Sequence, residues 1–471
     1  MRPRPTTLGE LQAGGWRDRS VKEELRHNVI GRLTAGEELF PGVVGFEDTV
    51  VPGLERALLA GHDLVLLGER GQAKTRLIRA LVDLLDPEAP IVEGCEVNDS
   101  PSRPICARCR LLVTERGDDT PVEWVGRRRR YAEKLATPDT SVADLIGDVD
   151  PIRVAEGRYL SDELTMHFGL VPRTHRGIFS INELPDLPAR IQVSLFNILE
   201  ERDVQIRGFA VRLPLDLLLV ASANPEDYTN RGRIITPLKD RFGSEVRTHY
   251  PRRPSEEMRI MDQEARRPAS GMAAQVPGFM KEILAEFTRQ ARLSPHINQR
   301  SGVSVRLSIA NLETLAASAV RRGLRNAEPE AVPRVADLPA VLQSSSGRVE
   351  FEAFEEGREE EVLTQLLAYA VLEVFRRHLS GFDFSGLLRP FQQDDLVVES
   401  GDLVPASVLL EHFGESPELE ALLRRLELPD ASPAMAASAL EFALEGLHLS
   451  RRLNKLASPQ GSLYSGREKA A

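Results

Sequence analysis

The segment DLVLLGERGQAKTRLIRALVDLL, residues 63–85, constrains the fold of this chain more than any other stretch of its sequence. An apolar run is followed by a glycine-containing turn and then by a helical pattern that opens with Lys74 and Thr75. This order is typical of a phosphate-binding loop, in which backbone N–H groups and the start of a helix face the phosphates of a nucleoside triphosphate. We therefore predict an ATP site in which Lys74 reaches the β and γ phosphates and Thr75 ligates Mg²⁺.

One position of the loop departs from the GxxxxGK[ST] pattern, because Ala73 stands where glycine is expected. If that position needs a positive φ, the Cβ of alanine costs about 1 kcal/mol, and weaker nucleotide binding would follow. The alternative is a chance glycine-rich turn, which the apolar strand before the loop and the helix after it disfavour. The predicted nucleotide-binding residues of the loop are Gly68, Glu69, Arg70, Gly71, Gln72, Ala73, Lys74, Thr75 and Arg76.

The segment RTHRGIFSINELPDL places two polar residues, Asn182 and Glu183, at the end of a second apolar run. ATP hydrolysis needs one carboxylate towards the magnesium shell and a second that polarises the attacking water. Glu183 can be this general base, whereas the neutral amide of Asn182 holds the magnesium shell less strongly than a carboxylate, which predicts slow hydrolysis. The competing interpretation is a buried strand that simply runs into a turn at Pro185.

A third polar residue, Asn224, ends the apolar run LDLLLVASAN. Open α/β sheets place ligand-contacting residues at the carboxyl ends of their strands, so this amide can orient the water that attacks the γ phosphate. Further on, LKDRF presents Arg241 at the end of a predicted surface helix, where it could stabilise the charge of phosphoryl transfer on a neighbouring subunit. The structural alternative for Arg241 is a surface ion pair with Asp240 or a nearby acid.

The periodicity of the chain predicts an α/β fold. Between residues 40 and 250, short apolar runs alternate with amphipathic helical stretches, which indicates a parallel sheet covered by helices. Beyond residue 255 helical spacing dominates the sequence. We predict four segments: an N-terminal helical segment at 1–39, a P-loop core at 40–255, a helical lid at 256–345 and a helical C-terminal extension at 346–471.

The order of GERGQAKT, INELPDL, VASANPED and LKDRF resembles that of AAA+ ATPases. More narrowly, VVGFEDTVVPGLERALLAG and ANPEDYTNRGRIITPLKDRFG are similar to the ATPase subunit of magnesium chelatases, in a resemblance that covers residues 40–310. The resemblance implies a homo-oligomeric ring, a hexamer, in which Arg241 of one subunit reaches ATP on the next. It also implies that Val44 and Gly45 lie near the adenine and that Arg306 senses the γ phosphate, with Arg300 as the alternative.

The same resemblance implies a function. We expect an ATP-driven motor that remodels a separate partner protein with an integrin-type metal-binding domain, since the DxSxS motif of such a domain is absent from this chain. Two alternatives stay open: a true magnesium chelatase subunit that drives Mg²⁺ insertion into protoporphyrin, and a scaffold that binds ATP with little hydrolysis. The segments 150–169 and 203–216 resemble the two insertions of the family that line the ring pore or face a partner.

The three cysteines of the chain lie together in CEVNDSPSRPICARC. Cys95, Cys106 and Cys109 provide a CxxC pair with a third thiol upstream, which can form part of a zinc site. Reduced structural thiols are an equal alternative, and the lack of a fourth cysteine disfavours an iron–sulfur cluster. The candidates for a fourth zinc ligand are Asp99, His167, His175 or water.

The charge balance bears on partners and location. A formal net charge of -11 argues against a large nucleic-acid interface, which needs a basic surface. The run Arg127–Arg130 either binds an acidic partner or nucleic acid or forms a solvated face balanced by acids, which is the commoner outcome for such a run. No stretch has the apolar length of a signal peptide or a membrane span, and the few cysteines suit a reducing compartment, so a cytoplasmic location is predicted.

Overall fold

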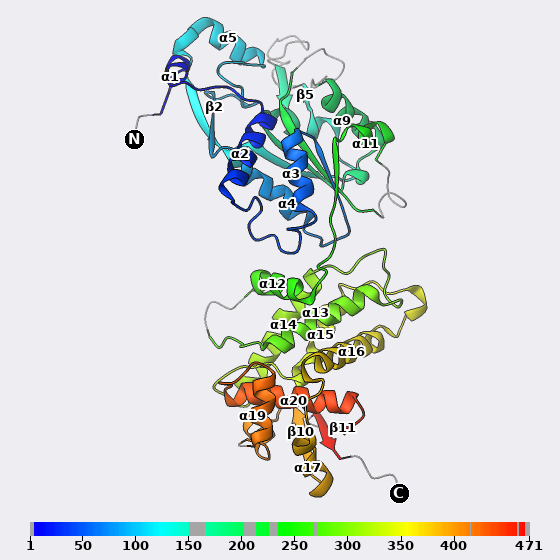
Figure 1. Ribbon diagram of the computed structural model, residues 1–471. Helices are drawn as coiled ribbons and strands as arrows, with labels where there is room; N and C mark the ends of the chain where they lie inside the picture. Colours follow the sequence, from blue (N-terminus) through cyan, green and yellow to red (C-terminus); the bar gives the residue numbers. More distant parts are fainter. Residues whose placement is uncertain are drawn as a thin grey trace. The chain divides into compact units, whose positions relative to one another are not determined.

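The computed structural model describes residues 4–149, 165–201, 213–225, 234–266, 271–414, 416–458 and 461–466. The chain forms two compact units, Met1–His249 and Tyr250–Ala471 (Figure 1). Most of the predicted insertion at 150–169 and of that at 203–216 lies outside the described residues. In the described part of the chain, no helix combines the length and the apolarity needed to cross a bilayer.

A five-stranded parallel sheet in the order β4-β7-β8-β1-β9 forms the centre of the first unit, as the sequence predicts. Every residue of β1, β7 and β8 is buried, because helices cover both faces of the sheet and leave these strands as continuous apolar runs. The strands of this sheet are β1 (Leu64–Leu67), β4 (Tyr131–Leu135), β7 (Gly177–Asn182), β8 (Leu217–Ala223) and β9 (Ser244–Arg247).

The side chains of β1 alternate between the two faces. Leu64 and Leu66 pack in a cluster with α2, α3 and α4, whereas Val65 and Leu67 pack in a second cluster with α9 and α11. The helices of the unit are α1 (Leu8–Ala13), α2 (Val21–Ala35), α3 (Val51–Ala60), α4 (Lys74–Ala80), α5 (Ala107–Arg116), α6 (Val142–Leu145), α8 (Leu170–Arg173), α9 (Ala189–Glu201) and α11 (Thr236–Arg241), with short 3-10 turns η1 (Leu81–Leu84), η2 (Gly117–Asp119), η3 (Arg127–Arg130) and η5 (Leu184–Asp186).

Among the described residues, the first unit also contains two small antiparallel sheets. The first pairs β2 (Glu88–Val92) with β3 (Val122–Gly126), and α5 lies in the connection between them. The second pairs β5 (Gly147–Val149) with β6 (Met166–Phe168), which flank the undescribed part of the first insertion.

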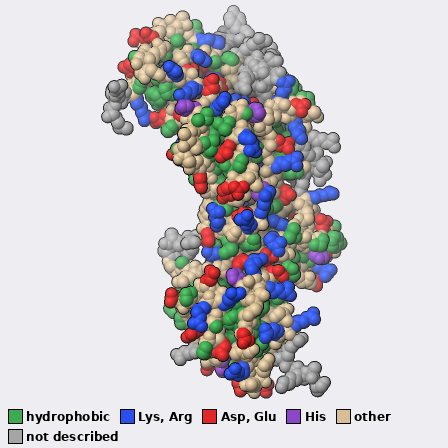
Figure 2. Space-filling view, viewed as in Figure 1, with side chains coloured by type: hydrophobic (Ala, Val, Ile, Leu, Met, Phe, Trp, Pro, Cys, Tyr) green, Lys and Arg blue, Asp and Glu red, His purple; other side chains and the backbone are tan. Residues whose placement is uncertain are grey.

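Three of the four arginines of η3 pair with acids within the unit. Arg130 is 1% exposed, and its guanidinium donates to both carboxylate oxygens of Glu24 in α2, at 2.8 and 2.6 Å. Arg127 and Arg129 form ion pairs with acids on neighbouring elements. The structure therefore favours the interpretation of this run as one balanced by acids, and acidic and basic side chains are interspersed over the face seen in Figure 2.

The second unit has one hydrophobic core, which extends from Met261 to Tyr464. Its helices are α12 (Pro254–Glu264), α13 (Gly278–Leu293), α14 (Arg306–Arg325), α15 (Val341–Ser346), α16 (Glu359–Leu379), α17 (Ser385–Gln393), α18 (Ala406–Leu410), α19 (Pro417–Arg425) and α20 (Pro433–Leu449), with 3-10 turns η6 (Val335–Ala340) and η7 (Ala353–Glu355). A three-stranded antiparallel sheet, which the sequence analysis did not predict, is formed by β10 (Val397–Gly401), β12 (Gly461–Ser465) and β11 (Asn454–Ser458).

The two units group the four predicted segments differently from the sequence pattern. Helix α2 contributes Val21, Leu25 and Val29 to the core of the first unit, so this helix of the predicted N-terminal segment packs as part of the α/β core. The predicted lid and the C-terminal extension share the single core of the second unit. Periodicity identifies helices, but it does not show which apolar faces meet.

Candidate functional site

The predicted phosphate-binding loop connects β1 to α4. Gly68 is required at its start, because an added Cβ would lie 1.9 Å from Thr248 Oγ1 and 2.3 Å from Gln72 Oε1. The buried Gln72 side chain holds the loop: its Oε1 accepts hydrogen bonds from the Glu69 N–H at 3.0 Å and from the Thr248 hydroxyl at 2.9 Å. The loop curvature is thus set by contacts between its own residues and the end of β9.

Ala73 has a φ of 54° and a ψ of 17°, which is the left-handed conformation, immediately before α4 begins. The position therefore does require the conformation that glycine adopts most easily. A residue with a Cβ in this conformation carries strain of about 1–2 kcal/mol.

We expect Ala73→Gly to raise the free energy of unfolding of the first unit by about 1 kcal/mol, because glycine removes this strain. The measurement is denaturant unfolding of the full chain. Ala80→Gly at the end of α4, where the backbone is right-handed, is the matched control and should lower stability by roughly 0.5–1 kcal/mol. Equal effects of the two substitutions would contradict the assignment of strain to Ala73.

Lys74, Asn224 and Glu183 form one hydrogen-bonded chain across three neighbouring strand ends. The Lys74 ammonium donates to the Glu69 carbonyl at 2.9 Å and to Asn224 Oδ1 at 2.6 Å. The Asn224 amide in turn donates to Glu183 Oε2 at 2.8 Å. These residues follow the carboxyl ends of β1, β8 and β7, the edge at which open α/β sheets bind ligands.

Glu183 itself adopts a φ of 56°, and its backbone N–H donates to the Ser222 hydroxyl of β8 at 3.3 Å. Positive φ at a residue with a side chain is concentrated at functional sites, where the surrounding structure holds it.

Asn182 lies beside a carboxylate that the sequence analysis missed. Its amide nitrogen donates to Glu133 Oε1 at 2.6 Å, and its Oδ1 accepts from the Ser222 hydroxyl at 3.3 Å. Glu133 stands on β4 and also accepts two hydrogen bonds from Arg79, at 2.8 and 3.0 Å, and one from the Tyr131 hydroxyl. The Arg79 guanidinium holds the pKa of Glu133 below its ordinary value. A negative charge is therefore present next to the neutral Asn182.

The remaining predicted site residues differ in how exposed their side chains are. Thr75 is half-buried in the first turn of α4, while Arg70 and Arg76 are exposed. Arg241 ends α11, and its guanidinium stacks on the Phe196 ring at 4.5 Å from the centroid. The roles of all the predicted site residues stay predictions, including those of Val44 and Gly45, half-buried before α3, and of Arg300 and Arg306, exposed in the second unit.

A cavity of about 370 Å³ adjoins the loop, and Gly68, Glu69 and Gln72 line one side of it. Two cations that the sequence analysis did not single out, Lys239 and Arg247, line it as well. Their position beside a phosphate-binding loop suits an anionic ligand.

The structure brings the three cysteines together with Asp99, one of the four candidates for a further ligand. Two of the other candidates lie apart from this group. His167 is exposed on β6, and the His175 ring accepts a hydrogen bond from the Asp216 N–H at 2.9 Å while burial lowers its pKa to about 3.

Part of this chain is similar in sequence to known proteins. Residues 124–242 match the family model described as AAA domain (dynein-related subfamily), a range that includes Glu183, Asn224 and Arg241. The magnesium-chelatase 38 kDa subunit of Cereibacter sphaeroides is 31% identical over 221 residues, covering 45% of this chain and 59% of that protein. The magnesium-chelatase subunit ChlI of Anabaena variabilis is 27% identical over 205 residues, covering 42% of this chain and 56% of that protein.

A cryo-electron microscopy structure of the complex between the BchI and BchD subunits of magnesium chelatase also matches, with 23% identity, a TM-score of 0.36 and coverage of 69% of this chain and 98% of that one. This chain spans less than two thirds of the length of the curated relatives named above.

The α/β sheet and the loop suit a P-loop protein, and residues 124–242 are similar to an AAA domain, the module of the AAA+ class. Within that class the chain resembles the ATPase subunit of magnesium chelatases.

Proposed function

We propose that this chain binds Mg²⁺·ATP at the loop 68–75 and hydrolyses it. The observation that carries the proposal is the chain of hydrogen bonds from Lys74 through Asn224 to Glu183. It joins a phosphate-binding cation, an amide that can orient water and a carboxylate that can accept a proton, all at the ligand-binding edge of the sheet.

The residues of the loop fit a triphosphate. The close approach of Thr248 and Gln72 to Gly68 leaves no space for a Cβ, so glycine at this position allows the tight turn that a phosphate-binding loop needs. Lys74 can exchange its bonds to the loop carbonyls for bonds to the β and γ phosphates. Bound Mg²⁺ would neutralise charge on these phosphates, with Thr75 as its protein ligand.

Glu183 takes the proton from the attacking water in this proposal. Asn224 holds the Glu183 carboxylate in place and orients the same water through its amide. Because the Asn224 side chain also bonds to Lys74, movement of Lys74 towards a phosphate would release Asn224 from that contact. The water-activating pair is thereby coupled to the occupancy of the phosphate site.

Asn182 and Glu133 together take the place of the usual metal-facing aspartate. Arg79, which binds Glu133, lies four residues after Thr75 and therefore on the same face of α4. This places the Glu133 carboxylate on the side of the helix that carries the proposed magnesium ligand. The arrangement supports hydrolysis, at a rate below that of a site with an aspartate at position 182.

We expect Asn182→Asp alone to impair the protein, because it would set two carboxylates against each other where Asn182 Nδ2 and Glu133 Oε1 now lie 2.6 Å apart. At neutral pH the expected loss of stability is about 1–3 kcal/mol, of the size found when a buried polar group loses its partner. The loss should shrink at acidic pH, where one carboxyl can hold a proton. Denaturant unfolding at several pH values is the measurement.

The double variant Asn182→Asp with Glu133→Gln is the control for this prediction. The amide of the new glutamine can donate to the new aspartate, which restores the bond with its direction reversed. Stability should recover relative to Asn182→Asp, and ATP turnover should exceed that of Glu133→Gln alone. If the double variant is no more stable than Asn182→Asp, the Asn182–Glu133 contact is not the cause of the loss.

At the level of assembly, the proposal is a homo-oligomeric ring, a hexamer, in which Arg241 acts on the neighbouring subunit. The ring would use ATP turnover to remodel a partner protein with an integrin-type metal-binding domain. Similarity to named magnesium-chelatase subunits supports a partner-dependent motor, and it keeps Mg²⁺ insertion into protoporphyrin as the second candidate.

The test of hydrolysis measures both ATP turnover and nucleotide binding, in the natural chain and in Glu183→Gln. Tight binding of ATP by the natural chain without measurable turnover would favour the scaffold that Asn182 suggests.

A further inference from the structure

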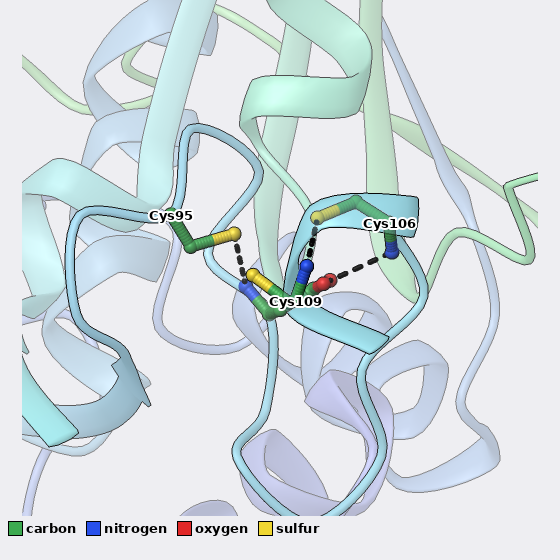
Figure 3. A group of neighbouring side chains, drawn as sticks. Cys95, Cys106 and Cys109 are labelled. Carbon is green, nitrogen blue, oxygen red and sulfur yellow. Dashed lines mark hydrogen bonds between the residues drawn. The ribbon is translucent and has the colours of Figure 1, made fainter. Parts of the chain in front are cut away.

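Three thiols and one carboxylate converge where the segment after β2 meets the start of α5. Cys95, Asp99, Cys106 and Cys109 are between 0% and 6% exposed. One potential ligand atom from each lies within 4.8 Å of the others. Figure 3 shows the thiols turned towards one another, with Cys95 from the segment after β2 and the other two from the start of α5.

The backbone holds these side chains in place. The Asp99 N–H donates to Cys95 Sγ at 3.3 Å, and the Cys109 N–H donates to Cys106 Sγ at 3.4 Å. The Cys106 N–H donates to Asp99 Oδ2 at 2.9 Å. Donors directed at ligand atoms in this way orient metal ligands and stabilise their charged forms.

One oxygen of the buried carboxylate has no hydrogen-bond partner in the part of the chain that the structure describes. Asp99 is 0% exposed, and its Oδ1 makes no hydrogen bond to any residue that the structure describes. An unpaired buried carboxylate oxygen is costly, so native structures provide a donor, a cation or a metal for it. The other three members of the group around Asp99 are thiols, which are weak donors. A cation bound among these side chains would satisfy this oxygen.

We propose that Cys95, Asp99, Cys106 and Cys109 bind one Zn²⁺ ion in a closed structural site. A tetrahedral ion with Zn–S bonds of about 2.3 Å holds its ligand atoms about 3.8 Å apart, which fits the observed spacing. Mg²⁺ and Ca²⁺ need six or more oxygen ligands, and this group offers one carboxylate. An iron–sulfur cluster takes four thiolates, whereas this site has three.

The ion would anchor the β2–α5 segment to the core of the first unit. The cysteines pack in the same apolar cluster as Val92 and Val97. Asn98, within the segment, donates to the Arg173 carbonyl at 2.8 Å, so the segment also contacts α8. None of the four ligands is in the phosphate loop, and the proposal does not depend on ATP hydrolysis.

The test measures metal content in the full chain. We expect about one Zn²⁺ per chain by plasma mass spectrometry after purification without added metal. After Zn²⁺ is removed with a chelator, Co²⁺ should restore the site and produce thiolate-to-cobalt charge transfer and the visible bands of tetrahedral Co²⁺. Protein without zinc that also fails to take up Co²⁺, or protein that contains iron and labile sulfide, would overturn the proposal.

Variants test the ligand set. Asp99→Asn and Cys106→Ser should each weaken Co²⁺ binding about tenfold or more. Asp118→Asn, an exposed aspartate in η2 of the same region, is the control and should bind Co²⁺ as the natural chain does. If Cys106→Ser fails to fold, thiol labelling of the natural chain replaces it: the three cysteines should react only after the metal is removed. Unchanged Co²⁺ affinity in Asp99→Asn would exclude Asp99 as a ligand.

Discussion

Glu183→Gln should lower ATP turnover by about 10²–10⁴-fold while ATP binding is retained, because a positioned general base contributes about that factor. The substituted amide keeps the size of the side chain and can still accept a hydrogen bond from Asn224, which now donates to Glu183 at 2.8 Å. Only the capacity to take a proton from water is lost. Phosphate release and equilibrium binding of a fluorescent ATP analogue measure the two properties separately.

Glu37→Gln, an exposed carboxylate outside the site, is the matched control and should leave turnover unchanged. If Glu183→Gln hydrolyses ATP at the rate of the natural chain, Glu183 is not the base. If the natural chain itself binds ATP without turnover, the scaffold becomes the better description of this protein.

Arg241→Ala should lower turnover by about 10³-fold or more, since an arginine supplied to the transferring phosphate contributes about 10³–10⁵. The proposal places this arginine on one subunit and the ATP on the next. Rings made only of Arg241→Ala chains, or only of Glu183→Gln chains, should therefore be inactive. In co-expressed rings, a Glu183 from one variant can meet an Arg241 from the other, and part of the activity should return.

The return of activity in mixed rings separates this role from a structural one. Arg241 stacks on Phe196 of its own chain, so its loss could disturb α9 and α11 without any effect between subunits. In that case mixed rings would stay as inactive as the separate variants. Arg116→Ala, an exposed arginine in α5, is the control for removal of surface charge.

Much of the candidate ATP site could be located without coordinates. Lys74, Glu183 and Asn224 each follow an apolar run, and the parallel strands of an α/β sheet bring their carboxyl ends to one edge. The sequence also indicated that a positive φ at Ala73 would be strained, because the loop pattern expects glycine at that position. These inferences needed only local order along the chain.

The partners of these residues could not be located in this way. Glu133 lies on β4, the edge strand YAEKL, in which no apolar run marks a strand. It reaches Asn182 only because β4 pairs with β7, and pairing between distant segments is not encoded in periodicity. The three-stranded sheet of the second unit was missed for a similar reason, since β10 lies far from β11 and β12 in sequence.

The phosphate loop and the cysteine cluster each combine residues that the local sequence pattern identifies with partners that only the tertiary structure identifies. Sequence order alone identified the loop, its lysine and three thiols, because each depends on residues within a few positions of one another. Only the tertiary structure placed Asp99 beside the three thiols and a carboxylate beside Asn182. Buried polar groups need hydrogen-bond partners. In both cases these partners lie on segments that come together only when the chain folds.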